Sequence, residues 1–381
     1  MLEKKHLEFR EKIRAFALEQ IAPLAQTLDN EQRFHNEHMQ PLTEMGLLSM
    51  LIPEEYGGKP TDTICYSIAV EEVSRVCGST GITLAAHNSL GTFPILKFGS
   101  DEQKKKYLPR AANGELIAFG LSEPDAGSDA GGTRTHAHRE GDYWIVNGSK
   151  CWITSATKAF ATIATARTSE NPEDRTITSF ILEKAWEGYA VGKKENKLGL
   201  RGSDTAFLHF DDLKCPVANQ LGKEGEGFKQ MLITLDGGRI SIGAMALGLG
   251  QGALDCAIKY AAERVQFGKP IAYNQAIQHR LADMTTELEA ARLMIYEASR
   301  MKDAGQPFSH FSAMCKLYAS EVARRAAESA LTILGSVGYL IGKYPAERIW
   351  RDVKLCEIGE GTSEIQRLVI ARHILKEVQK S

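Results

Sequence analysis

Residues 143–153 read YWIVNGSKCWI, in which β-branched and aromatic residues stand on both sides of Asn147-Gly148. Asn-Gly between two such runs is typical of a two-residue hairpin turn, because both residues tolerate positive φ. The stretch therefore predicts two antiparallel strands joined at Asn147-Gly148. Further short strand patterns occur at 160–166, 177–182 and 205–210, so we expect a β domain around it.

Helical periodicity brackets this β domain on both sides. Before it, apolar residues recur at helical spacing, as at Phe9, Ile13 and Phe16. After it, long helical runs with short connections predict a helical bundle. The expected fold class is α+β, with an N-terminal all-helical domain (1–115), a middle antiparallel β domain (116–225) and a C-terminal four-helix bundle (226–381).

The composition is that of an ordinary soluble protein. The chain has 381 residues, of which 43% are hydrophobic, and its formal charge of -2 predicts neither nucleic acid nor a membrane as a partner. No apolar run is long enough to span a bilayer, and acidic residues follow Met1 closely, which targeting peptides avoid. The seven cysteines are scattered, which indicates reduced thiols and a cytoplasmic location.

Two patterns suggest sites but lack the necessary context. Gly248-Leu249-Gly250-Gln251-Gly252 has the glycine spacing of a dinucleotide loop, yet it lies inside a helical run, where small residues allow close packing. His35 and His38 could be pictured as a metal pair, but further ligands are missing and we expect them on a surface helix. We therefore expect neither a Rossmann fold nor a metal site.

Two segments next to or within the β domain offer polar or aromatic groups to a ligand. Residues 121–129 read LSEPDAGSD, a turn-rich loop whose hydroxyls and backbone N–H groups could bind polar ligand atoms, although an irregular surface loop has the same composition. Trp152-Ile153-Thr154 follows on a short strand, where the tryptophan alone could simply be part of the core.

The third segment, residues 359–367, reads GEGTSEIQR. Ser363 and Gln366 match the S-x-x-Q capping box, so a helix should begin at about Glu364. Glu360 falls just before it, between two glycines that allow a ligand to approach the backbone. A single glutamate in front of a helix is usually a solvated charge or a partner of the helix dipole.

Together the three segments resemble the acyl-CoA dehydrogenase family over essentially the whole chain, with its short-chain members as the nearest likeness. They are similar to the family patterns T-E-P-x-A-G-S-D, W-I-T and Y-E-G-T-S-x-I-Q-R, with Ser122 and Gly359 in place of the usual Thr and Tyr. The resemblance implies FAD-dependent α,β-dehydrogenation of acyl-CoA thioesters to trans-2-enoyl-CoA. Glu360 would remove the α proton, and the flavin would take the β hydride.

The resemblance also implies a set of binding residues. Arg264 and Gln275 match positions that often reach the flavin from a neighbouring subunit, which implies a homotetramer, and an electron-transferring flavoprotein would accept the electrons. Substrate contacts are expected from Ser128, Asp236, Arg239 and Gly361. Flavin contacts are expected from Phe119, Leu121, Ser122, Gly127, Ser128, Trp152, Ile153, Thr154, Arg264, Phe267, Gln275, Thr332, Gly335, Ser336, Thr362 and Glu364.

Several alternatives remain open from the sequence. Some branched-chain and long-chain relatives carry their base at the position of Gly238, but glycine cannot serve, which favours Glu360. A short straight acyl chain is expected first and a short branched chain second, because Gly359 leaves space beside the reacting carbons. Two other functions also remain possible from the sequence: an acyl-CoA oxidase and a non-catalytic assembly protein with the same fold.

Overall fold

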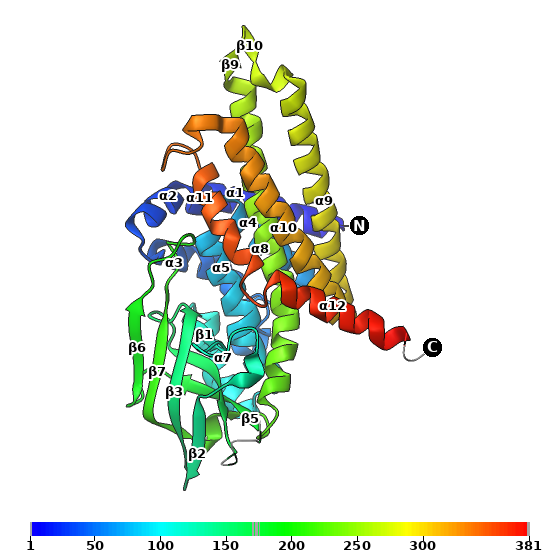
Figure 1. Cartoon of the computed structure of the whole chain (residues 1–381). Helices are drawn as coiled ribbons and strands as arrows, with labels where there is room; N and C mark the ends of the chain where they lie inside the picture. The colour runs from blue at the N-terminus through cyan, green and yellow to red at the C-terminus, as the bar shows by residue number, and fades with distance from the viewer. Residues whose placement is uncertain (1, 170, 172–173, 175, 379–381) are drawn as a thin grey trace.

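The computed structural model describes residues 2–169, 171, 174 and 176–378. Figure 1 shows a helical N-terminal part, a β-sheet at one end of the molecule, and long C-terminal helices that run away from the sheet. The first part contains π-helical turns at Ala17–Ile21 (η1) and His87–Thr92 (η4). Its α-helices are α1 (Lys4–Phe16), α2 (Ala22–Glu31), α3 (Asn36–Glu44), α4 (Thr63–Val76), α5 (Gly78–Ala86), α6 (Phe93–Phe98) and α7 (Asp101–Ala112).

The middle part forms one eight-stranded sheet. Most neighbours are antiparallel, but β1 and the first residue of β2 pair with β4 in parallel, so the predicted antiparallel domain is a mixed sheet. The strand order is β6-β7-β3-β2-β4-β5-β8, with β1 beside β4. The strands are β1 (Ile117–Gly120), β2 (His136–Glu140), β3 (Tyr143–Thr154), β4 (Ala161–Arg167), β5 (Ile177–Glu183), β6 (Tyr189–Lys194), β7 (Thr205–Pro216) and β8 (Gln220–Leu221).

The predicted hairpin at Asn147-Gly148 is wrong. Both halves of the stretch belong to the single strand β3, which pairs with β7 on either side of a register shift at this point. The Asn147 side chain exchanges hydrogen bonds with Asp212 of β7, at 3.0 and 2.8 Å. Asn147 therefore lies opposite a β-bulge in β7, where the two residues Asp211 and Asp212 face it, while the hairpin turn lies at Gly141-Asp142, between β2 and β3.

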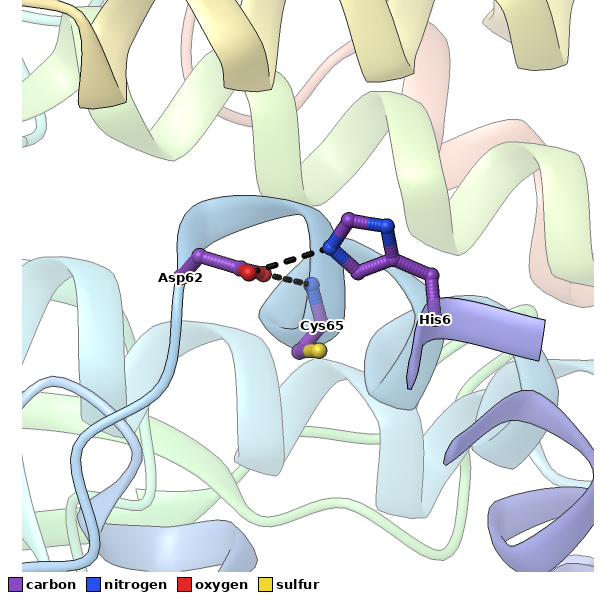
Figure 2. A group of neighbouring side chains, drawn as sticks. All are labelled: His6, Asp62 and Cys65. Atoms are coloured by element: carbon purple, nitrogen blue, oxygen red, sulfur yellow. Dashed lines mark hydrogen bonds and ion pairs between the residues drawn. The ribbon is translucent and has the colours of Figure 1, made fainter. Parts of the chain in front are cut away.

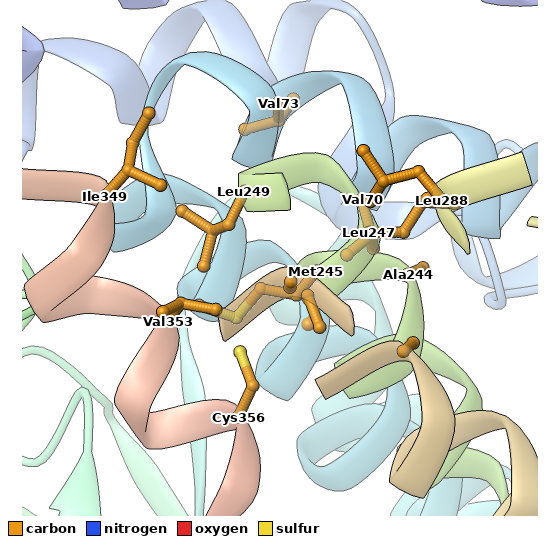
Figure 3. Close-up of a cluster of buried hydrophobic side chains, with 14 of the residues drawn as sticks. Val70, Val73, Ala244, Met245, Leu247, Leu249, Leu288, Ile349, Val353 and Cys356 are labelled. Atoms are coloured by element: carbon orange, nitrogen blue, oxygen red, sulfur yellow. The ribbon is translucent and has the colours of Figure 1, made fainter. Parts of the chain in front are cut away.

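The C-terminal part is built on α8 (Gly227–Glu263), α9 (Gln275–Asp303), α10 (Ser309–Leu334) and α12 (Ser363–Val378), with the short α11 (Ala346–Val353) beside them and the β9–β10 hairpin (Val265–Gln266, Lys269–Pro270) at the tip. By length and composition α8 could cross a membrane, but 78% of its most apolar window is buried inside the protein, as in the core helix of a globular domain. Its core position is visible in Figure 3, where Val73 of α4, Leu249 of α8 and Ile349 of α11 lie in one buried cluster.

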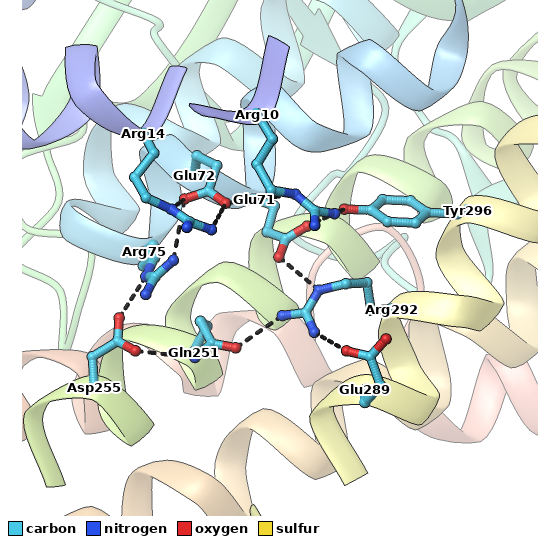
Figure 4. Close-up of polar contacts among 10 residues, drawn as sticks. All are labelled: Arg10, Arg14, Glu71, Glu72, Arg75, Gln251, Asp255, Glu289, Arg292 and Tyr296. Atoms are coloured by element: carbon cyan, nitrogen blue, oxygen red, sulfur yellow. Dashed lines mark hydrogen bonds and ion pairs between the residues drawn. The ribbon is translucent and has the colours of Figure 1, made fainter. Parts of the chain in front are cut away.

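Charged residues join the N-terminal helices to the bundle. Glu71 of α4 accepts hydrogen bonds from Arg292 Nε at 3.0 Å and from the Tyr296 hydroxyl at 2.5 Å, and both donors are on α9 (Figure 4). Its neighbour Glu72 receives two hydrogen bonds from Arg14 of α1. Both glutamates are buried, and such carboxylates are tolerated inside a protein because their charge is paired and hydrogen-bonded.

His6, Asp62 and Cys65 bring ligand-type atoms within 4.8 Å of one another (Figure 2). His6 Nδ1 accepts the Glu3 N–H at 3.0 Å, so Nε2 must carry the proton and donate to Asp62. Burial and then Asp62 raise the pKa of the Cys65 thiol to about 12, which keeps it protonated at neutral pH. Neither side chain is in the protonation state that binds a metal. The cluster instead caps two helices: His6 accepts the Glu3 N–H at the start of α1, and Asp62 accepts the Cys65 N–H at 2.8 Å at the start of α4.

We expect Asp62→Ala to lower the free energy of unfolding by about 1–2 kcal/mol, the usual cost of losing an N-cap, as measured by denaturant titration. Burial alone would raise the pKa of Asp62, but hydrogen bonds from Cys65, Lys5 and His6 lower it overall. The stabilisation is therefore complete above the unfolded pKa of about 4 and lost as the pH falls. Asp62→Asn keeps a cap acceptor and should lose less; equal losses would contradict the capping role.

The prediction that His35 and His38 lie on a surface helix is wrong. Both side chains are buried, and His35 Nε2 and His38 Nδ1 are hydrogen-bonded to the hydroxyls of Thr83 and Thr80 on α5, at 2.9 and 2.8 Å. Burial lowers the pKa of His35 to about 3 and that of His38 to about 4. The two imidazoles are neutral packing groups that dock α3 on α5.

Candidate active site

The segment that carries Glu360 is a tight turn between the 3-10 turn η9 (Lys354–Glu357) and α12. Glu360 and Gly361 both have positive φ, 53° and 94°, an arrangement that is costly for a glutamate. The side chain of Gln366 donates to the carbonyl groups of Glu360 and Gly361, at 3.2 and 2.8 Å. Lys316 of α10 donates to the Gly361 carbonyl at 2.7 Å. These donors hold the turn in its strained conformation.

The predicted helix cap is displaced by one residue. The helix begins at Ser363 rather than Glu364, and the hydroxyl of Thr362 accepts the Ile365 N–H at 3.3 Å. Gln366, which the capping-box pattern assigns to the helix terminus, is directed back to the turn carbonyls. The sequence pattern was right about the start of a helix but wrong about which side chains cap it.

The Glu360 carboxylate lies against α8. A Cβ atom added at Gly238 would stand only 1.9 Å from Glu360 Oε2, so only the absence of a side chain on α8 leaves room for this oxygen. Oε2 is buried and has no hydrogen-bond partner among the described residues. Burial raises the pKa of Glu360 to about 8, and the cations Lys316 and Arg239 oppose that rise. A carboxylate with these properties is suited to accept a proton near neutral pH.

Glu360 opens into a cavity of about 810 Å³ between the β domain and the bundle. Apolar residues from η4, α8 and the 355–369 region line much of it, including Leu90, Leu235 and Ile358. The structure brings twelve of the predicted site residues to this one cavity: Phe119, Leu121, Ser122, Gly127, Ser128, Trp152, Ile153, Thr154, Arg239, Glu360, Gly361 and Thr362.

A second irregularity in β3 shapes the wall of the cavity. The register of β3 against β7 shifts between Lys150 and Ile153, and Trp152 at this bulge has a φ of 57°. The bulge leaves the Trp152 side chain 59% exposed beside the cavity, although its neighbours in the strand are buried. Such a ring is available for stacking against a planar ligand.

The polar loop at 121–129 is held against β3 by hydrogen bonds and an ion pair. The Cys151 N–H donates to the Ser122 carbonyl at 2.9 Å. Lys150, which is fully buried, donates to Glu123 Oε1 at 2.6 Å. Glu123 also accepts the backbone N–H of Arg134 at 2.7 Å. The buried Lys150–Glu123 ion pair therefore fixes the loop. Ser122, Gly127 and Ser128 of the loop line the cavity.

Asp236 and Arg239 connect the cavity to a second hollow. Arg239 donates to Asp236 Oδ1 at 2.6 Å, and Ser309 donates to the same oxygen at 2.8 Å. Arg239 lines the first cavity, while Asp236 lines the second, which holds about 550 Å³ and includes Arg372, shared by both hollows. The second hollow also has His310, His373 and Lys376 in its wall. A basic region of this kind suits an anionic part of a ligand.

The remaining predicted residues do not line the cavity of this chain. Arg264, Phe267 and Gln275 lie at the β9–β10 tip of the bundle, distant from the sheet in Figure 1, and the Phe267 side chain is 97% exposed. Thr332, Gly335 and Ser336 lie exposed at the end of α10, and Glu364 is exposed on α12.

The comparisons with known proteins agree with this geometry. Models of the N-terminal, middle and C-terminal domains of acyl-CoA dehydrogenases match residues 3–115, 118–213 and 225–375. The mitochondrial short-chain specific acyl-CoA dehydrogenase of Rattus norvegicus is 47% identical over 376 residues, which cover 98% of this chain and 91% of that protein. This chain belongs to the acyl-CoA dehydrogenase family.

Solved acyl-CoA dehydrogenase structures support the same assignment. Butyryl-CoA dehydrogenase from Megasphaera elsdenii superimposes with a TM-score of 0.95 at 40% identity, covering 98% of this chain and 99% of that one. A chain solved in work on the electron-transferring flavoprotein of Acidaminococcus fermentans has a TM-score of 0.96 at 43% identity, with coverage of 98% and 99%. The order of helical, β and helical domains is that of the acyl-CoA dehydrogenase fold.

Several residues at the site of this acyl-CoA dehydrogenase carry no clear signal in the sequence. Lys316 was hidden in a helical pattern, where a lysine is usually a surface charge. His87 and Leu90 line the cavity because the π-helical turn η4 interrupts the regular helix there, a feature common at functional sites. Gln366 was assigned to a cap. For His87 and Leu90, the apolar residues of 81–90 predicted a packed helix but gave no indication of a ligand site.

Proposed function

We propose that this protein is a FAD-dependent acyl-CoA dehydrogenase that acts on short-chain acyl-CoA thioesters, with Glu360 as the base that removes the α proton. The observation that carries the proposal is the Glu360 carboxylate, buried without a partner at Oε2 and directed to a cavity that Trp152 and Thr154 also line. A short straight acyl chain is the first choice. A short branched chain is the alternative.

The cavity fits a flavin. Structural neighbours in the family bind FAD, and this chain offers an exposed aromatic ring at Trp152, the Thr154 hydroxyl beside it, and the small, polar Gly127 and Ser128 for close approach. When bound, FAD supplies the acceptor for the β hydride. The residues of the protein orient it and close the space around the reacting carbons.

The acyl-CoA thioester would enter past Arg239 and Asp236. The carboxylate of Glu360 holds the α proton once it has been removed, and its raised pKa matches this task at neutral pH. Burial of the site excludes water from the charge that develops. The basic wall formed by Arg372, His373 and Lys376 suits the phosphates of CoA.

We also propose the assembly state and the partners. Arg264, Phe267 and Gln275 lie too far along the bundle to line their own cavity, so their predicted flavin contacts require a neighbouring copy, as in a homotetramer. An electron-transferring flavoprotein is the proposed electron acceptor. A cytoplasmic location rests on the seven free cysteines, six of them buried. We propose domain limits at 115/116 and 225/226, which the change between helices and strands supports.

The test is anaerobic bleaching of the flavin absorbance by butyryl-, octanoyl-, isobutyryl- and 2-methylbutyryl-CoA. We expect the fastest bleaching with a short acyl chain. Rapid reoxidation of the reduced protein by air would indicate an acyl-CoA oxidase instead. Purified protein that is colourless and takes up no FAD would support a non-catalytic assembly protein, and would sink the proposal.

Gly359 is expected to set the tolerance for branching. An added Cβ would meet Leu355 atoms at 3.5–3.9 Å, which is ordinary contact, so a larger residue fits the backbone and would occupy the cavity wall. We expect Gly359→Tyr to lower kcat/KM for 2-methylbutyryl-CoA at least about tenfold more than for butyryl-CoA, the discrimination typical of one methyl group in a filled pocket. An equal effect on both substrates would show that Gly359 does not set branching.

A further inference from the structure

Lys316 is buried beside the reacting carboxylate. Its side chain on α10 has no exposed surface, and its ammonium donates to the Gly361 carbonyl, 45 residues away along the chain, at 2.7 Å. A lysine is almost never fully buried unless it is paired. The mechanism proposed above assigns it no role.

The hydrogen bond fixes the turn that aims Glu360. Gly361 has a φ of 94° and Glu360 a φ of 53°, so the carbonyl between Gly361 and Thr362 points inward, to Lys316 and Gln366. The two donors reach the same oxygen from different helices, α10 and α12. Gln366 alone can satisfy the carbonyl, so the hydrogen bond by itself does not explain why one donor is a cation.

The charges around the site supply the missing reason. Glu360 faces Arg239 of α8, Lys316 of α10 and Tyr66 of α4, while Glu357 and Cys356 of η9 lie near Lys316. Arg239 is already paired with Asp236 at 2.6 Å.

The carboxylate of Glu357 is already engaged as well. It is bound by Arg324 at 2.8 Å and by Lys354 at 2.6 Å. Of the two described cations that act on the Glu360 carboxyl, Arg239 is paired with Asp236, so Lys316 is the one whose charge can balance Glu360.

We propose that Lys316 is a positioning residue for the dehydrogenation: its buried ammonium clamps the Gly361 carbonyl and favours the ionised form of the Glu360 carboxylate in a site that excludes water. This inference rests on the proposed function. Lys316 does not line the cavity and acts through Glu360. Burial lowers the pKa of Lys316 to about 8, and the nearby Cys356, Glu360 and Glu357 oppose that fall. The cation therefore weakens as the pH rises through this range.

The test compares the pH profile of anaerobic flavin bleaching, at saturating butyryl-CoA, in wild-type holoenzyme and Lys316→Gln. Glutamine keeps a donor for the Gly361 carbonyl and removes only the charge. Because the base must be deprotonated, loss of a nearby cation should raise the apparent pKa by about one unit or more, which is about a tenfold slower rate at pH 7. The two profiles should converge at high pH, where wild-type Lys316 loses its own proton.

Two further variants separate charge from structure. Lys316→Arg keeps a cation at every accessible pH, so its apparent pKa should not exceed that of the wild type even if the rate falls. Gln366→Leu removes the uncharged donor to the same carbonyl and should lower the plateau rate without raising the pKa.

The outcomes distinguish the two proposals. If the wild type bleaches but Lys316→Gln has an unchanged pH profile, Lys316 has no electrostatic role and this inference is wrong. An apparent pKa of bleaching that is higher in Lys316→Arg than in the wild type would also show that the inference is wrong. This second test remains decisive if Lys316→Gln fails to fold. If no acyl-CoA bleaches the wild-type flavin, the proposed function fails and takes this inference with it.

Discussion

Glu360→Gln should bleach with butyryl-CoA about 10²–10⁴-fold more slowly than the wild type, the usual contribution of a positioned general base. The amide has nearly the shape of the carboxylate but cannot accept the α proton. Its oxygen or nitrogen would lie where Oε2 now stands without a partner, beside Gly238. The rate is measured by anaerobic stopped-flow spectroscopy of the flavin band.

Retention of FAD is the control for this experiment, because the exposed Trp152 and the 121–129 loop belong to other segments of the cavity lining and should be unaffected. Glu11→Gln, an exposed glutamate on α1, serves as a matched variant and should bleach at the wild-type rate. If Glu360→Gln kept its flavin and still bleached within a few-fold of the wild type, Glu360 would not be the base.

The order of the domains could be predicted from the sequence because it depends on local patterns. Helical period and strand alternation are properties of ten or so neighbouring residues. The motif residues from 119–128, 152–154 and 360–362 do meet in one cavity. Their meeting was inferred through resemblance, since spacing along the chain carries no information about distance in space.

The features that were missed depend on partners remote in the chain. Asn147-Gly148 has the same local pattern in a hairpin turn and in a continuous strand opposite a bulge, and only its pairing with Asp212 of β7 decides between them. His35 and His38 look like surface polar residues until Thr80 and Thr83 of α5 pack against them.

Lys316 is the extreme case, because a lysine in an amphipathic helix is normally solvated. Its partner carbonyl at Gly361 is presented only by the strained turn before α12. The predicted flavin residues at the β9–β10 tip do not line the cavity of a single protomer, so their proposed role depends on a neighbouring copy of the chain.

Two residues together determine where the proposed base can lie. Glu360 supplies the carboxylate, and Gly238 on α8 supplies the space that its oxygen occupies. A side chain at 238 and a carboxylate from 360 exclude each other. The same place in the cavity could therefore be reached by an acid from either segment, and glycine at 238 favours Glu360, on the turn before α12, as the proposed base.

This mutual exclusion makes Gly238→Ala the sharpest test of the geometry, with an expected loss of about 10²-fold in the rate of flavin bleaching, because a displacement of about 1 Å at a reacting group costs that much. The new methyl group would stand 1.9 Å from Glu360 Oε2 and 3.1 Å from Leu90 Cδ2, and the carboxylate, at the end of a flexible side chain, is the group that must move.

Gly237→Ala is the matched control for that variant, since it adds the same methyl group one residue earlier on α8. There the nearest atom is Lys302 Nζ at 3.6 Å, an ordinary contact, and alanine in a helix interior stabilises by about 1 kcal/mol over glycine. Gly237→Ala should keep the wild-type rate with equal or higher stability. Equal rates in both variants would mean that the carboxylate does not need the space above Gly238, and the assignment of Glu360 as the base would lose its geometric support.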